Sequence, residues 1–188
     1  MSRGPGQRAG LTRTAVLAAA HDLLAEQGLE ALTMRSLARR LDVAPNALYS
    51  HVPGKTELVD ALLDDRLSLI EEPSADAPDP VGAVAALMTS TYEVLLTRPD
   101  LVPLYLARQG SRGPNAVRLG VVMDALLRRT GLADEAVPPA RRALIVHAIG
   151  GAAFAGADGP IPAELAHADF ARSLRWLLAG IAGDRVDG

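Results

Sequence analysis

The chain has 188 residues, of which 49% are hydrophobic, 22% charged and 3% aromatic, enough for one substantial core or for a small module joined to a larger one. The lack of cysteine excludes disulfides and thiolate metal sites, and no uncharged apolar run reaches about 18 residues, which argues against a membrane-spanning helix. Since the first residues also lack the apolar core of a secretory signal, we expect a soluble cytoplasmic protein with no membrane partner.

The formal net charge of -3 is unevenly distributed along the chain. Residues 1–55 contain seven basic and four acidic side chains, whereas residues 56–188 contain twelve basic and eighteen acidic ones. A basic N-terminal segment on an acidic body indicates that the first segment contacts a polyanion while the rest has another task.

Helical periodicity dominates from the start of the chain. Apolar residues recur at spacings of three and four, and no segment alternates strictly between apolar and polar residues, which predicts an all-α fold. The first helix is expected over residues 13–27. Thr12 is a good N-cap for it, Leu11 and Val16 form a hydrophobic staple, and Gly28 is a stop signal.

Two short helices are predicted next. Thr33 repeats the capping pattern and opens a helix that ends near Leu41. Pro45 suits the first position of a third helix, expected over residues 45–51. The short gap between them is that of a helix-turn-helix motif, in which one helix crosses the DNA backbone and the next enters the major groove by its N-terminal end.

The segment LTMRSLARRLDVAPNALYSHVPGKTEL, residues 32–58, resembles the DNA-binding domain of the tetracycline-repressor (TetR) family, and residues 12–31 resemble that family's first helix. The resemblance implies a helix-turn-helix DNA-binding domain with a basic N-terminal arm over residues 1–54. It further implies a larger helical domain for ligand sensing and dimerisation over residues 55–188.

The first turn of the third helix is the part that can reach base edges. Asn46 could pair bidentately with an adenine and Ala47 could contact a thymine methyl group. Hydrogen-bond donors at nearby helix ends suit phosphate oxygens, and for Tyr49 and Lys55 the resemblance implies the same role. The candidate DNA-contacting residues are Thr33, Arg35, Pro45, Asn46, Ala47, Tyr49, His51 and Lys55.

Other interpretations of these residues stay open. Asn46 is also compatible with a solvated surface amide, Tyr49 with a half-buried ring, and His51 with a helix cap. In the turn, where the family usually has Gly, this chain has Asp42, which tolerates left-handed geometry better than most residues. The arm, with Arg3 and Arg8, either enters a minor groove or is an inert basic tail.

The second domain is expected to contain about six helices. The first of them runs from Lys55 to about Glu71 and ends in the linker EEPSADAPDP, whose prolines and acids forbid a continuous helix. The others are predicted over about residues 81–97, 101–109, 115–130, 140–156 and 168–182.

Small residues near the end of the 140–156 helix would let another backbone approach closely, which compensates for the cost of glycine in a helix. In the TetR family the last two helices form a four-helix bundle with those of a second subunit. The resemblance therefore implies a homodimer that reads a palindromic operator. Packing within one subunit is the alternative. The expected interface residues are Gly150, Gly151, Phe154, Leu174, Leu177 and Leu178.

A small-molecule pocket is the remaining expectation, implied mainly by the family's general use of this domain as a sensor. Mostly apolar side chains with a few polar handles are typical of such pockets, although each residue alone is also compatible with an ordinary core. The candidates are Met88, Tyr92, Tyr105, Arg108, Met123, Leu127, His147 and Phe154.

These patterns together predict a dimeric repressor that a small, largely apolar effector releases from DNA. An orphan DNA-binding regulator, whose second domain only dimerises or binds a protein, is the alternative. No enzymatic activity, cofactor or metal is expected. The four histidines lack metal-ligand spacing, and the sequence has neither a Gly-rich phosphate loop nor a nucleophile elbow.

Overall fold

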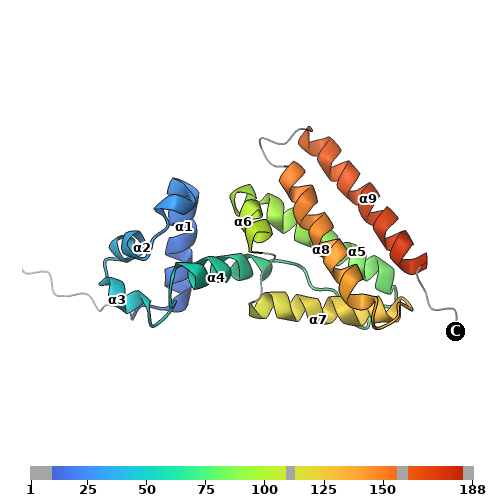
Figure 1. Ribbon diagram of the computed structural model, residues 1–188, viewed down its shortest axis with the longest axis horizontal. Coiled ribbons are helices and arrows are strands. Elements are labelled where there is room, and N and C mark those ends of the chain that lie inside the picture. The colour runs from blue at the N-terminus through green and yellow to red at the C-terminus, as the bar shows by residue number, and fades with distance from the viewer. Residues whose placement is uncertain (1–9, 109–112, 156–160, 184–188) are drawn as a thin grey trace, which may run out of the picture. The chain divides into compact units, whose positions relative to one another are not determined.

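The computed structural model describes residues 10–108, 113–155 and 161–183, and in these ranges its elements are helices without any β-strand (Figure 1). The fold is therefore all-α, as the sequence predicts. The chain divides into two compact units, Met1–Leu62 and Leu63–Gly188. The basic arm with Arg3 and Arg8 lies outside the described residues.

Local capping defines the first helix of unit 1. The backbone N–H of Ala15 donates to Thr12 Oγ1 at 3.1 Å, which confirms the predicted N-cap. Gly28 has φ 77° and ψ 177°, a conformation that interrupts the helix, and one further turn follows it. The helices of this unit are α1 (Arg13–Ala31), α2 (Met34–Arg40), α3 (Pro45–Leu48) and the start of α4 (Lys55–Leu67).

The second and third helices begin where predicted, but α3 ends earlier. Thr33 and Ser36 form a reciprocal capping box at the start of α2. After Leu48 the chain turns away, because the N–H groups of His51 and Val52 both donate to the Leu48 carbonyl at 2.9 Å. The helix expected over residues 45–51 is thus a single helical turn followed by a hydrogen-bonded turn.

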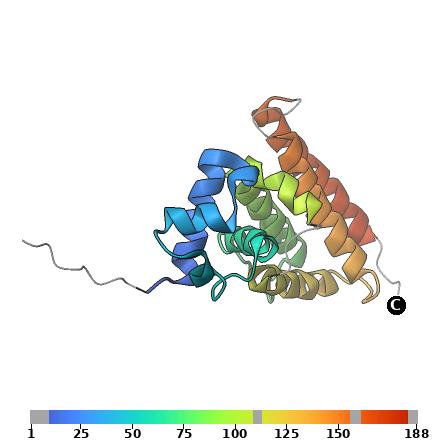
Figure 2. The same cartoon turned by 60° about the vertical axis from the view of Figure 1, so that its left-hand side comes forward.

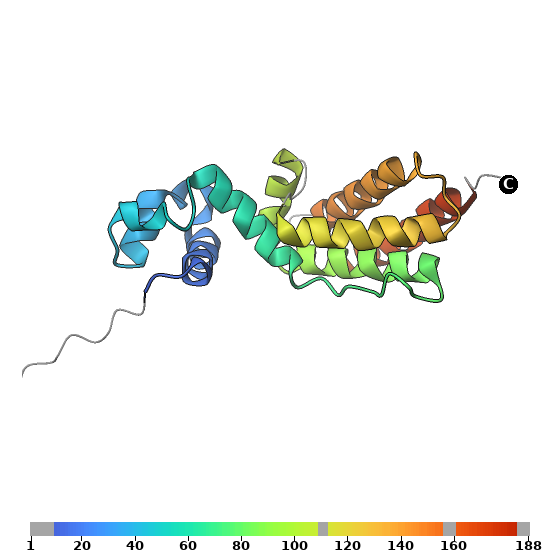
Figure 3. The ribbon, with the colours of Figure 1, turned by 90° about the horizontal axis from the view of Figure 1, so that it is seen from below.

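Unit 2 is built around α5, which packs against α7, α8 and α9 (Figures 1 and 3). Helices α8 and α9 lie side by side (Figure 2). Among the described helices none is by itself long and apolar enough to cross a membrane, and only the bent pair of α5 with the segment Pro99–Ala107 meets that test jointly. The remaining elements of unit 2 are α5 (Pro80–Leu96), η1 (Pro99–Leu101), α6 (Val102–Ala107), α7 (Pro114–Arg129), α8 (Val137–Phe154) and α9 (Ala163–Gly183).

Several predicted boundaries need correction. Helix α4 ends at Leu67 rather than near Glu71, because the next three amides bond three residues back and tighten the chain into turns. Helix α8 begins at Val137 rather than after the two prolines, since its first turn needs no N–H from Pro138 and Pro139. Helix α9 likewise begins at Ala163, earlier than the expected start near residue 168.

Candidate nucleic-acid interface

The turn between α2 and α3 is closed by backbone hydrogen bonds around a left-handed residue. The N–H of Asp42 donates to the Arg39 carbonyl at 3.3 Å, and that of Val43 to the Ala38 carbonyl at 3.0 Å. These two bonds form a Schellman motif with Asp42, φ 52°, in the position that glycine usually takes. The tolerance of Asp42 for left-handed geometry, expected from the sequence, is confirmed, and the turn fixes where α3 begins.

The first turn of α3 presents its side chains to solvent. Leu48 is fully buried in unit 1 and holds the short helix in place. Pro45, Asn46 and Ala47 are exposed on the other side, and Tyr49 is 49% exposed just after them. The residues predicted to reach base edges thus form one continuous exposed surface, with an anchored helix beneath it.

Two of the arginines on α2 are available to a ligand and one is not. Arg35 and Arg39 are exposed, and their side chains make no hydrogen bond or ion pair with the part of the chain that the structure describes. Arg40 instead forms a bidentate pair with Glu26 of α1, both N–O distances being 2.7 Å, and lies 3.6 Å from Asp22. Arg39 is not among the DNA-contacting residues predicted from the sequence. Its position at the end of α2, beside the turn, could have indicated it as a candidate.

The ion pair between α1 and α2 is reflected in the acidity of both groups. Hydrogen bonding to Arg40 lowers the pKa of Glu26, and hydrogen bonding to Glu26 raises the pKa of Arg40. Both groups therefore stay charged, and Arg40 serves to join the two helices.

Some predicted phosphate ligands have partners within the chain. Lys55 Nζ donates to the Leu29 carbonyl at 3.1 Å, just beyond the break at Gly28, and so ties the start of α4 to the end of α1. The Thr33 hydroxyl is occupied by the capping box with Ser36. His51 is half-buried after α3. Contact with phosphates by Lys55 or Thr33 would compete with these internal bonds.

Comparisons with known proteins show which protein family this helix-turn-helix unit resembles. Residues 16–62 match the family model described as "Bacterial regulatory proteins, tetR family". The chain belongs to the TetR family. An HTH-type transcriptional regulator of Saccharopolyspora erythraea is 31% identical over 140 residues, 74% of this chain and 59% of that protein. The HTH-type transcriptional repressor DrrR1 of Streptomyces coeruleorubidus is 35% identical over 135 residues, 71% of this chain and 48% of that one. The chain thus matches about half the length of these relatives.

Solved structures share the fold over nearly the whole chain. BioQ of Mycobacterium smegmatis superposes with a TM-score of 0.80 at 28% identity, covering 93% of this chain and 99% of that one. A structure of BioQ with its double-stranded DNA operator gives a TM-score of 0.74 at 28% identity, with 92% and 98% covered. ActR of Streptomyces coelicolor in complex with (S)-DNPA gives 0.78 at 25% identity, with 93% and 98% covered.

In unit 2 of this TetR-family chain, the end of α4 is held by contacts with three other elements. Burial raises the pKa of Tyr105 well above its usual value, so its hydroxyl stays protonated and donates to the Leu63 carbonyl at 2.6 Å. Arg66 donates to Thr97 Oγ1 at 2.6 Å, after the end of α5. Tyr105, a predicted pocket residue, is therefore a buried contact between α6 and α4.

The third contact joins α4 to the N-terminus of α7. The buried carboxylate of Asp64 accepts hydrogen bonds from the backbone N–H of Asn115 at 3.2 Å and of Ala116 at 2.9 Å. These are among the N–H groups that a helix leaves unsatisfied at its start. Gly113 lies so close that a Cβ there would overlap the Asp64 side chain. Asp64 thus caps a helix other than its own.

Of the remaining predicted pocket residues, only His147 lines the groove described below. Met88, Met123 and Leu127 are buried core residues, whereas Arg108 is exposed at the end of α6. Phe154 is 61% exposed in the single chain, and its contact with an effector stays a prediction. Within the described residues no group of three or more His, Asp or Glu side chains is placed to hold a metal ion.

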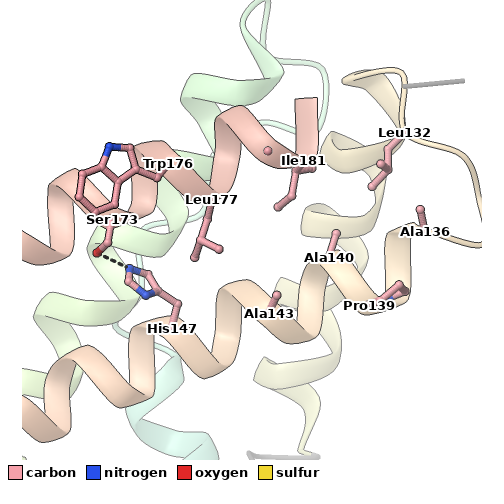
Figure 4. A pocket seen from close by; sticks show the side chains of 11 residues that line it. Leu132, Ala136, Pro139, Ala140, Ala143, His147, Ser173, Trp176, Leu177 and Ile181 are labelled. Atoms are coloured by element: carbon pink, nitrogen blue, oxygen red, sulfur yellow. Dashed lines mark hydrogen bonds between the residues drawn. The ribbon is translucent and has the colours of Figure 1, made fainter. Parts of the chain in front are cut away.

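An open apolar groove runs between α8 and α9, with a volume of about 760 Å³ (Figure 4). His147 lies in it and is hydrogen-bonded to Ser173 Oγ at 3.1 Å, and Trp176 beside it is 67% exposed. The lining residues are Leu132, Ala136, Pro139, Ala140, Ala143, His147, Ser173, Trp176, Leu177, Gly180 and Ile181.

Burial within the single chain divides the expected interface residues into two groups. Leu174 and Leu178 are almost fully buried within the single chain, so they belong to its core. Gly151 is covered by the chain's own rings, whereas a Cβ added at Gly150 would meet no described atom within 4 Å. Leu177 and the exposed Phe154 remain on the surface. Helix α9 has apolar residues on two sides, and only the packing within the chain decides which side is buried and which stays exposed.

Proposed function

We propose that this chain is a dimeric transcriptional repressor that binds a palindromic DNA operator in the cytoplasm and is released by a small, largely apolar effector. The observation that carries the proposal is the exposed first turn of α3, at Pro45, Asn46 and Ala47, held by the Schellman turn before it and by buried Leu48. This is the geometry that a helix-turn-helix needs to reach base edges. The solved complex of BioQ with its operator supports DNA as the partner.

A dimer follows from the apolar surface on α8 and α9. Trp176, Phe154, Val146 and Leu165 are all more than half exposed on these two helices. Large contiguous apolar patches mark interfaces, and these two helices pack side by side. A second copy packed there would bury them and supply the second recognition helix for a two-fold symmetric site.

The release mechanism that we propose is a two-state linkage through α4. Its first residues belong to unit 1 and Leu63–Leu67 belong to unit 2, where Tyr105, Thr97 and the start of α7 hold it. An effector that favours another arrangement of α6 or α7 would therefore move Leu63–Leu67, the end of α4 that these hydrogen bonds hold. The paired recognition helices would then fit successive major grooves less well. The ActR complex with (S)-DNPA supports small-molecule binding on this fold.

Selection from a random DNA pool with the full-length protein tests DNA recognition. We expect enrichment of a palindrome whose half-sites are about one helical turn apart. Enrichment of no sequence, or only of non-palindromic DNA at any salt concentration, would sink the proposed operator.

Thermal unfolding with a panel of lipophilic metabolites then tests sensing. A ligand at 100 times its dissociation constant adds about 2.7 kcal/mol of stability. A hit that leaves operator affinity unchanged at saturation would favour the orphan regulator over the ligand-released repressor.

A further inference from the structure

Three parallel rings from three helices form a stack inside unit 2. Phe170 of α9 is 3% exposed, and its ring lies 4.0 Å from that of Tyr92 of α5 at 7°. It also lies 4.9 Å from the ring of His147 of α8 at 10°. Two rings on the same face of Phe170 at these separations would contact each other. Since Tyr92 and His147 make no such contact, they cover opposite faces.

The edge of this stack is shaped by a missing side chain. A Cβ on Gly151 would lie 2.9 Å from Phe170 Cδ2 and 3.4 Å from Tyr92 Cε2. The separation from Phe170 is shorter than real Cβ contacts, so glycine leaves the space that the Phe170 ring fills. Tyr92, His147 and Gly151 thus form a slot of one ring's thickness.

The Tyr92 ring, one wall of the slot, carries a polar group that has no partner among the described residues. Tyr92 is 0% exposed, and its hydroxyl has no hydrogen-bond partner in the part of the chain that the structure describes. Burial also raises the pKa of Tyr92, so the group stays protonated and able to donate at neutral pH. A buried hydroxyl without a partner is destabilising, and phenylalanine would stack equally well without that cost. The hydroxyl is therefore available, as far as the described residues go, to donate a hydrogen bond to a bound molecule.

We propose that the slot between Tyr92 and His147 is where the effector is recognised, through a planar aromatic ring that bears a carbonyl or phenolic oxygen. Phe170 fills the slot while the effector is absent. The effector ring takes the place of Phe170 but lies tilted to the Tyr92 ring, which brings its oxygen close enough to accept the hydrogen bond of the Tyr92 hydroxyl. This inference rests on the proposed sensing function and names the chemical class of its ligand. Because Phe170 belongs to α9, its displacement also moves a helix of the proposed dimer surface.

Phenol is the probe for the slot, and the full-length variant Phe170→Ala provides the vacancy. Phenol should bind this variant about tenfold more tightly than benzene, the effect of one net hydrogen bond. In Phe170→Ala/Tyr92→Phe this preference should vanish. Leu174→Ala, which empties an equally buried position one turn along α9, is the matched control and should show no preference. Equal binding of phenol and benzene to Phe170→Ala would overturn the proposal.

Two further measurements test the inference even if Phe170→Ala fails to fold, because they use the wild-type chain or the single variant Tyr92→Phe. Tyr92→Phe alone should raise Tm by about 2–4 °C by removing an unsatisfied buried group. A lower Tm would show that the hydroxyl is already satisfied and would overturn the inference.

In the wild-type chain, phenol must compete with Phe170, so binding is weaker by the cost of displacing that ring. The only tryptophan, Trp176, reports on α9. Its emission should change saturably with phenol, and less in Tyr92→Phe. No saturable change would contradict displacement. DNA binding is measured in parallel without phenol. Failure of phenol binding and failure of DNA binding can then be told apart.

Discussion

Asp42 occupies a turn position at which most side chains are strained. Its φ of 52° lies in the left-handed region, and the two hydrogen bonds that close the turn depend on that conformation. The residue can be identified from the sequence because its place in the turn is local. Its energetic effect is local too.

Asp42→Gly should therefore stabilise the protein by about 0.5–1 kcal/mol, since glycine adopts this conformation without steric cost. Asp42→Ala should destabilise it by about 1 kcal/mol. Urea denaturation of both variants measures the difference. If alanine were as stable as glycine, the left-handed conformation of this turn would be in doubt.

Asn46 is exposed in the first turn of α3, the part of this helix that we propose contacts base edges. Asn46→Ala should relax preference at one base pair of the selected operator, at a cost of about 1–3 kcal/mol there. Competition binding with single-base variants of the operator measures this. The control is Ser50→Ala, an exposed residue after α3, which should keep every preference. Unchanged preferences in Asn46→Ala would show that another residue reads the base.

Arg39 and Arg40 form a matched pair of neighbours on α2. Arg39 is exposed and has no ion pair among the described residues, whereas Arg40 is held by Glu26 and Asp22. Arg39→Ala should reduce the salt dependence of DNA binding by about one unit of slope and leave Tm unchanged. Arg40→Ala should lower Tm and change the slope less. Equal slopes for the two variants would contradict the assignment.

Local sequence signals predict where some helices begin, but not every helix end or buried face. Caps such as Thr12 and Thr33 act on the nearest N–H groups, so the starts of α1 and α2 could be predicted from a few residues. The end of α4 and the roles of α9 depend on packing. Leu174 is buried while Trp176, two residues on, is exposed, and the apolar pattern of α9 alone does not distinguish them.

The same limit applies to the predicted sites. The exposed turn of α3 could be predicted because the helix-turn-helix spacing is contained in one short segment. The ring slot could not, because Phe170 meets Tyr92 only when α5, α8 and α9 assemble. The pocket residues predicted from the sequence include Tyr92 and His147 but neither Phe170 nor Gly151.

The cap that α4 provides for α7 is sensitive to a single methyl group. Gly113→Ala would place a Cβ against the Asp64 side chain and should destabilise the protein by about 1–3 kcal/mol. The control is Gly183→Ala, at the end of α9 with no described atom near an added Cβ, where the change in stability should be small. Denaturant unfolding compares them. A neutral Gly113→Ala would mean that the Asp64 contact is not rigid.

At the scale of the whole molecule, the proposed dimer places the exposed apolar surface of α8 and α9 against a second copy of the chain. Trp176→Glu should shift the protein to monomers and weaken operator binding strongly, because burying an unpaired charge in the interface is costly. Val121→Glu, at a similarly exposed apolar position on α7, is the matched control and should stay dimeric. Sedimentation velocity reports the state, and a dimeric Trp176→Glu would place the interface elsewhere.

Lys55 gives the molecule an unusual chemical property. It is the only lysine of the sequence, so its Nζ is the single side-chain amine, and it lies at the start of α4 against the Leu29 carbonyl. An amine-reactive acylating reagent would mark this one side chain besides the N-terminus. The rate of acylation, with and without operator, would then show directly whether the amine exchanges its internal carbonyl partner for a phosphate.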